Sequence, residues 1–102
     1  MPLYHVVLFK LKPSVTAEQS AELTKKAYAM VTKIPGLSKI SVGPPLPATV
    51  HRSKEFNLGI VAILEKPEDL AGYATHPAHM EVQDYRQDLC EDTLVYDLVF
   101  DS

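Results

Sequence analysis

Three segments of this chain carry the residue types of β-strands and are apolar on both of their faces. They are "LYHVVLFKLK" (residues 3–12), "NLGIVAILE" (57–65) and "TLVYDLVF" (93–100). Each is rich in β-branched, aromatic and other large apolar residues, as strands usually are. A sheet with one face in water shows alternating apolar and polar residues along its strands. Because these segments do not alternate in that way, both faces of their sheet need cover.

A first helix is expected over residues 16–34. Thr16 followed by Gln19 has the pattern of a capping box, and the Pro35-Gly36 pair marks the end. We expect its apolar side to be broad, since two adjoining stripes run along it: Leu23, Ala27, Met30 and Ile34 in one, and Ala17, Ala21, Thr24, Tyr28 and Val31 in the other.

The order of the elements predicts the fold class. A short strand, 37–43, follows the first helix, and the proline-rich stretch 44–56 is expected to form a long irregular loop. Two helical pieces, 66–75 and 76–92, each with a proline near its start, precede the closing strand. The resulting β-α-β-β-α-β order predicts an α+β, ferredoxin-like fold, an antiparallel sheet with helices on one face, as a single domain over residues 1–102.

The second face of the sheet has no cover within a chain of this length. The helices pack on one face, and 102 residues leave no further segment for the other. We therefore expect a second copy to pack sheet against sheet, as a two-fold homodimer that closes a dimeric α+β barrel. Each large side chain buried in this way contributes about 1.5–3 kcal/mol.

Charge and composition argue against several classes of protein. The net charge of −3, with scattered lysines and arginines, disfavours a nucleic-acid partner. The apolar run at the N-terminus is too short to span a membrane and lacks a small-residue cleavage site, so we expect no membrane partner. The single cysteine, Cys90, fits a reducing compartment, which predicts a cytoplasmic protein. Cys90 is expected late in a helix, as a small buried hydrophobe more than as a nucleophile.

The stretch "GYATHPAHMEVQDYRQDL" (72–89) holds the residues best suited to catalysis. His79 lies two residues after Pro77, in the first turn of a helix, whose positive end favours the neutral imidazole. A neutral histidine can act as a base near pH 7. Tyr73 precedes the break between the two helical pieces, and its hydroxyl is expected to meet that imidazole. The alternative is structural: His79 caps the helix or fills a gap, and Tyr73 packs in the core.

The remaining histidines have simpler interpretations. His76 precedes Pro77 and is expected to cap the helix, while His51 is expected to be exposed in the proline-rich loop. His5 is either a hydrogen-bonded core histidine or a polar group lining a cavity between the sheet and the helices. The chain has no HExxH pattern, paired cysteines, glycine-rich phosphate loop or Gly-x-Ser-x-Gly elbow, so we expect neither a metal nor a cofactor.

Several stretches together resemble a known family. They are "YHVVLFKLK", the "IPG" that ends the first helix, and "YATHPAHMEVQDYRQDL" before "LVYDLVF". Nearly the whole chain is similar to the stress-responsive A/B barrel (Dabb) family, which implies a dimer with facing sheets. The family includes stress-induced proteins and a plant polyketide cyclase that performs an aldol condensation. The resemblance implies that His79 abstracts a proton, that Tyr73 assists it, and that His5 lies in the pocket.

Two functions follow from these observations. The first is a cofactor-free lyase or cyclase that acts on a small apolar carbonyl compound or polyketide, with His79 as base and Tyr73 as its partner. Its pocket is expected between the sheet and the helices and to be lined by His5, Val7, Phe9, Leu23 and Tyr28. The second is a non-catalytic stress-response or ligand-binding protein, whose His-Pro-Ala-His segment only starts a helix.

Overall fold

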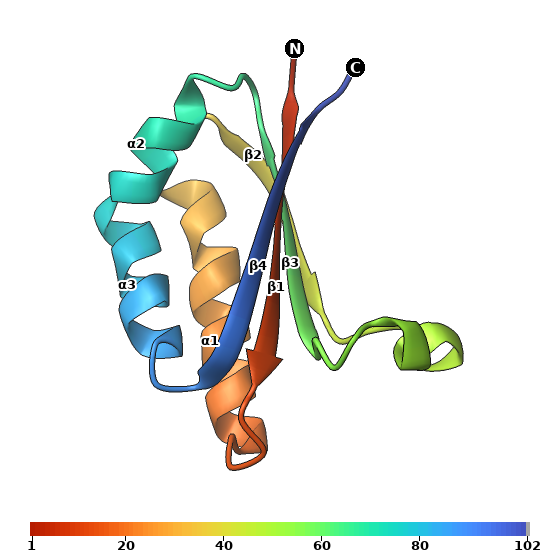
Figure 1. The fold of residues 1–102 in the computed structure, drawn as a ribbon. Coiled ribbons are helices and arrows are strands. Elements are labelled where there is room, and N and C mark those ends of the chain that lie inside the picture. The colour runs from red at the N-terminus through yellow and green to blue at the C-terminus, as the bar shows by residue number, and fades with distance from the viewer. Residues whose placement is uncertain (102) are drawn as a thin grey trace.

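Four antiparallel strands form one sheet, and the three α-helices lie on one of its faces (Figure 1). The computed structural model describes residues 1–101. The strand order is β2-β3-β1-β4, so β2 and β4 are the edges, and the predicted ferredoxin-like fold is confirmed. In chain order the elements are β1 (Leu3–Leu11), α1 (Ala17–Ala29), β2 (Leu37–Gly43), β3 (Leu58–Leu64), α2 (Asp69–Thr75), α3 (Pro77–Arg86) and β4 (Cys90–Val99), with short 3-10 helices at Met30–Thr32 and Pro47–Arg52.

The helix α1 begins with the predicted capping box, but it ends at Ala29, before the Pro35-Gly36 pair, and the 3-10 helix Met30–Thr32 follows it. The Gln19 N–H donates to the Thr16 hydroxyl at 3.1 Å, and the Thr16 N–H donates to the Gln19 side chain at 2.9 Å. Gly36 has a φ of +85°, and a Cβ there would collide with the Asp69 carboxylate, so this turn requires glycine. The buried side is narrower than predicted: one stripe packs on the sheet, Leu23, Ala27, Met30 and Ile34, whereas Ala17, Ala21 and Tyr28 of the other stripe are exposed.

The break between α2 and α3 falls at His76. Its backbone is extended, with φ −67° and ψ 139°, as is preferred for a residue before proline. Its Nδ1 accepts a hydrogen bond from the Ala78 N–H at 3.0 Å, which confirms His76 as the cap of α3. Pro77 takes the first helical position, where the N–H that proline lacks would have no intrahelical partner. This geometry brings His79 beside Tyr73, with ring centroids 4.7 Å apart.

The two faces of the sheet differ in their cover. The positions of β1 and β3 that face the helices are buried: Leu3, His5, Val7, Phe9, Leu58, Ile60, Ala62 and Leu64. The opposite side, called the open face from here on, carries apolar side chains on three strands: Tyr4, Val6, Leu8, Val61, Ile63, Leu94, Tyr96 and Leu98. None of the helices α1 to α3 reaches it (Figure 1). On β2 this side is polar, with Lys39 and Ser41, so the uncovered apolar surface is confined to β1, β3 and β4.

The helix before the closing strand is shorter than predicted, and the strand is longer. The helix α3 ends at Arg86, and the Leu89 carbonyl accepts a hydrogen bond from the Lys12 N–H at 2.8 Å. Cys90 therefore begins β4 opposite Leu11, beside an irregularity in the β1–β4 register, and does not lie in a helix. Pairing with the end of β1 outweighs the helical preference of the charged residues around it.

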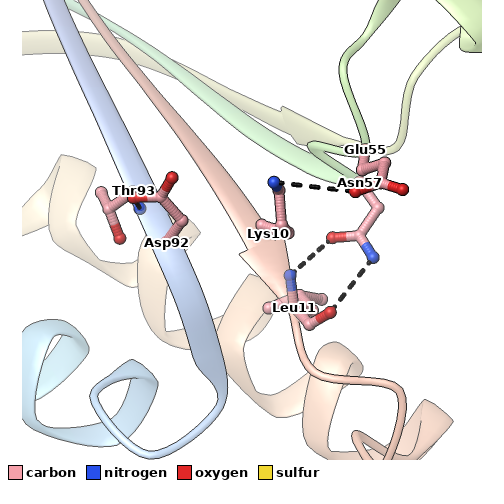
Figure 2. Close-up of polar contacts among 6 residues, drawn as sticks. All are labelled: Lys10, Leu11, Glu55, Asn57, Asp92 and Thr93. Carbon is pink, nitrogen blue, oxygen red and sulfur yellow. Dashed lines mark hydrogen bonds and ion pairs between the residues drawn. The ribbon is translucent and has the colours of Figure 1, made fainter.

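The proline-rich connection between β2 and β3 projects to the side of the sheet opposite the helices (Figure 1). Asn57 ties its end to β1: the Leu11 N–H donates to Oδ1 at 2.8 Å, and the Asn57 amide donates to the Leu11 carbonyl at 3.5 Å (Figure 2). Lys10 and Glu55 form a looser ion pair beside it, at 3.8 Å. Asn57 thus continues the β1–β3 contact beyond the last strand pair. His51 is exposed in this connection, as predicted.

Candidate functional site

A cavity of about 170 Å³ lies between the sheet and the helices. Its walls are mostly apolar, and a few polar side chains interrupt them. Pockets for drug-sized ligands measure about 300–1,000 Å³, so this cavity suits a smaller molecule. The lining includes the polar side chains of His5, Tyr73, His79 and Arg86. Val95 of the edge strand β4, which is 52% exposed, forms part of the rim.

Tyr73 of α2 is the buried phenol of this cavity. Its burial and, to a smaller extent, the charge of Asp97 raise its pKa to about 12. The phenol is therefore protonated around neutral pH and can donate a hydrogen bond. None of the hydrogen bonds described within residues 1–101 involves its hydroxyl, and Tyr73 lines the cavity. The expected contact with His79 is present as ring packing and not as a hydrogen bond between hydroxyl and imidazole.

His79 of α3 is half-buried, and its Nδ1 lies 2.9 Å from the carbonyl oxygen of Ala74. A carbonyl can only accept, so Nδ1 carries the proton and Nε2 keeps its lone pair. Burial lowers the pKa of His79 below its ordinary value of 6.5, and the charges of His5 and Arg86 add to this, while the hydrogen bond to Ala74 opposes it. At pH 7 the side chain is therefore neutral, with Nε2 as its basic atom.

His5 of β1 faces the same cavity and is held by Asp97 of β4. The two residues are opposite each other in the register, and His5 Nδ1 lies 2.6 Å from Asp97 Oδ1. The His5 ring packs edge-on against Tyr73, with centroids 5.1 Å apart. The structure therefore brings His5, Tyr73 and His79 together as one row of rings along a single cavity.

The predicted lining of the pocket is only partly found. Val7 and Phe9 line the cavity beside His5, whereas Leu23 and Tyr28 do not. Leu23 is fully buried in the contact between α1 and the sheet. Tyr28 lies on the outer stripe of α1, where its hydroxyl accepts a hydrogen bond from the Val42 N–H of β2 at 3.0 Å. Because α1 turns a single stripe toward the sheet, Met30 just after its end is the residue that reaches the cavity.

Two polar residues of the site were missed by reasoning from the sequence. Arg86 follows His79 by seven residues, a spacing that puts both on the same side of a helix. Its Nη1 donates to the Thr93 hydroxyl at 3.0 Å, and its guanidinium lies over the Phe9 ring, 5.4 Å from the centroid. Asp97 is the one acidic residue inside the apolar segment 93–100, and this isolated charge could have identified it from the sequence.

Two further observations concern the part of the chain that the structure describes. No group of three or more histidine, cysteine, aspartate or glutamate side chains lies close enough together there to hold a metal ion. None of its helices has the length and apolar character needed to cross a membrane.

Comparison with known proteins identifies the family. Residues 3–100 match the family model for the stress responsive A/B barrel domain. The chain is similar to olivetolic acid cyclase of Cannabis sativa, with 28% identity over 98 residues and 95% of each chain covered. The hydroxynitrile lyase from Passiflora edulis has a similar structure, with a TM-score of 0.87 and 17% identity, covering 98% of this chain and 94% of that one. A dimeric ferredoxin-like protein from Thermobifida fusca gives a TM-score of 0.84 and 20% identity, covering 98% and 92%. Since the family model spans nearly the whole sequence, the chain belongs to the stress responsive A/B barrel (Dabb) family.

Proposed function

We propose that this protein is a cofactor-free enzyme that uses His79 and Tyr73 for acid–base chemistry on a small apolar carbonyl compound. The observation that carries the proposal is the state of these two side chains in one cavity. His79 has a basic Nε2, because Nδ1 is bonded to Ala74, and Tyr73 has a hydroxyl without a described protein partner. The reaction class is an aldol-type cyclisation or cleavage, and the substrate type is a short polyketide. The similarity to olivetolic acid cyclase supports this class.

The reaction begins with a proton between two carbonyl groups of the substrate. Nε2 of His79 takes that proton, and the electrons of the C–H bond form an enolate. The Tyr73 hydroxyl donates a hydrogen bond to the enolate oxygen and stabilises its charge. The enolate carbon then attacks a second carbonyl of the same molecule, a C–C bond forms, and the new alkoxide takes the proton back from His79. The same steps in reverse cleave a C–C bond, and neither direction needs an oxidant or a reductant.

The open face supports a homodimer as the functional form. Its most exposed large side chains, Leu94, Tyr96 and Leu98, are each about half exposed or more, and contiguous apolar surface of this kind marks interaction sites. The chain measures 36 × 28 × 18 Å, and its broad side is large enough for a standard interface of about 800 Å² per partner. The dimeric relative from Thermobifida fusca agrees with this assembly. We place the dimer in the cytoplasm because a single cysteine suits a reducing compartment.

Deuterium exchange into a 1,3-diketone tests the proton abstraction directly. The probe is the methyl ester of 3,5-dioxohexanoate, a triketide, whose exchange between the two ketones is followed by NMR in D₂O against a protein-free control. The wild-type protein should accelerate exchange, and His79→Ala should abolish the acceleration. His51→Ala changes an exposed histidine outside the cavity and should leave it intact. Acceleration that survives His79→Ala overturns the proposal, and saturable binding without any exchange favours a ligand-binding protein instead.

A further inference from the structure

Arg86 is a half-buried cation on the wall of the cavity, and no carboxylate of the described chain pairs with it. The ion pairs within residues 1–101 involve His5, Lys10 and Lys26 as the cationic partners. The only other arginine of the chain, Arg52, is exposed in the β2–β3 connection. Removing a guanidinium from water is costly unless hydrogen bonds and an opposite charge compensate. Arg86 therefore stands out as a charge of the cavity wall whose counter-charge is missing among residues 1–101.

Neutral groups hold the guanidinium in place. Nη1 donates to the Thr93 hydroxyl at 3.0 Å, and the group lies over the Phe9 ring. These contacts fix its orientation but supply no full negative charge. The neighbouring Cys90 thiol does not supply one either, because its burial raises its pKa above the ordinary value of 9.0, against the opposing effect of Arg86.

The one carboxylate beside the row of rings is already paired. Asp97 lies 2.6 Å from His5 and holds that ring. The charge of Arg86, in contrast, acts on the cavity, where it contributes to lowering the pKa of His79. The carboxylate of Asp97 is thus paired with His5, whereas the guanidinium of Arg86 has no carboxylate partner within residues 1–101.

We propose that the substrate carries a carboxylate and that Arg86 binds it, which makes the substrate a short keto acid anion and not a neutral ketone. This inference rests on the proposed function for the chemistry at His79 and Tyr73. The planar fork of arginine matches a carboxylate, with two parallel N–H donors. Arg86 follows His79 by seven residues, about 10 Å along the helix axis, and both side chains line one cavity. Arg86 anchors the acid end and leaves the carbon between the ketones to His79.

The volume of the cavity bears on the size of the substrate. At about 170 Å³ it accommodates a compact chain. As a probe of binding and proton abstraction, the triketide acid 3,5-dioxohexanoate combines a terminal carboxylate, a methylene between two ketones and a short backbone; ring closure would need a further ketone. Its methyl ester has nearly the same shape without the charge, so the pair of compounds isolates the contribution of Arg86.

Binding titrations with this pair test the inference. Affinities for 3,5-dioxohexanoate and its methyl ester are measured by NMR titration with the wild-type protein, which needs no substitution. The acid should bind at least about tenfold more tightly, as expected for a charge-assisted hydrogen bond. Arg86→Gln should remove this preference, Arg86→Lys should restore part of it, and the matched control Arg52→Gln should leave it unchanged. Circular dichroism confirms that each variant is folded.

The outcomes separate this inference from the proposed function. Any one of four results overturns the role of Arg86. The first two are equal affinity for acid and ester, and an acid preference that survives Arg86→Gln. The other two are equal losses of acid affinity in Arg86→Gln and Arg52→Gln, and no binding of the acid at millimolar concentration. Deuterium exchange is measured on the same samples. Arg86-dependent binding of the acid without accelerated exchange overturns the acid–base function and leaves the carboxylate site standing.

Discussion

Replacing two leucines of the open face, Leu94→Asp together with Leu98→Asp, should separate the proposed dimer into folded monomers. Both side chains belong to the edge strand β4, and each is 49% exposed in the single chain. They lie opposite Leu8 and Tyr4 of β1, inside the apolar surface that no helix covers. Neither contributes to the cavity, which is on the other side of the sheet.

The expected effect follows from the exposed fractions. Full burial of a leucine is worth about 1.5–3 kcal/mol, so covering the exposed half of Leu94 or Leu98 contributes roughly 0.7–1.5 kcal/mol. Two-fold symmetry repeats both positions, and four leucines together contribute about 3–6 kcal/mol to the interface. Their loss weakens the dimer by a factor of roughly 10²–10⁴. The unpaired aspartates that replace them add a desolvation cost, which moves the result further in the same direction.

Sedimentation velocity at micromolar concentration measures this effect. The wild-type chain should sediment as a dimer and the double variant as a monomer, while circular dichroism shows that both are folded. Met80→Asp is the matched control, because Met80 is 40% exposed but lies on α3, outside the sheet. This variant should remain a dimer. A monomeric wild-type chain, or a double variant that stays dimeric at the same concentration, refutes the proposed interface.

Three further outcomes are expected. The rate of proton abstraction should fall only below pH 6.5, because lowering the pH through the depressed pKa of His79 protonates the base. The rate should stay level to about pH 10, because the pKa of Tyr73 is about 12. A pH–rate profile with its acidic midpoint above 6.5 contradicts this. Tyr73→Phe should slow exchange about 10–100-fold while changing the melting temperature little, because the lost hydroxyl has no described protein partner; equal losses of rate and stability would point to a structural role. Asn57→Ala should lower the free energy of unfolding by about 1 kcal/mol in urea titrations, because it removes two hydrogen bonds to Leu11. An unchanged urea midpoint would show that water replaces these bonds.

The order of the elements was predictable because strong local signals agreed with one another. Thr16 and Gln19 form the capping box that their spacing indicates, and Pro77 starts α3 as its missing N–H allows. The end of α3 was not predictable, since the charged residues from Arg86 to Asp92 suit a helix surface locally. Pairing with the end of β1 draws Cys90 into a strand, and that contact joins positions far apart in the sequence.

The candidate site was predictable where its residues are close together in the sequence. His79 and Tyr73 share one stretch of the chain, and a histidine on an apolar strand made His5 conspicuous. Tyr28 was placed in the pocket because two adjoining stripes of α1 looked equally apolar, and only packing on the sheet selects one of them. Arg86 was missed because charged residues on helices are normally solvated, and the sequence does not reveal the uncovered rim at β4.

The edge strand β4 connects the proposed dimer with the proposed chemistry. On one side it carries Leu94 and Leu98, which a second copy would cover, and on the other it carries Asp97, which holds His5 at the cavity. An edge strand pairs with a neighbour on one side only, so a partner that packs on its apolar side also steadies the residues on its other side. Loss of activity in the double leucine variant would thus be compatible with an intact cavity that has lost the support for Asp97. The oligomeric state must therefore be judged from sedimentation, and the role of the cavity from variants such as His79→Ala that leave β4 unchanged.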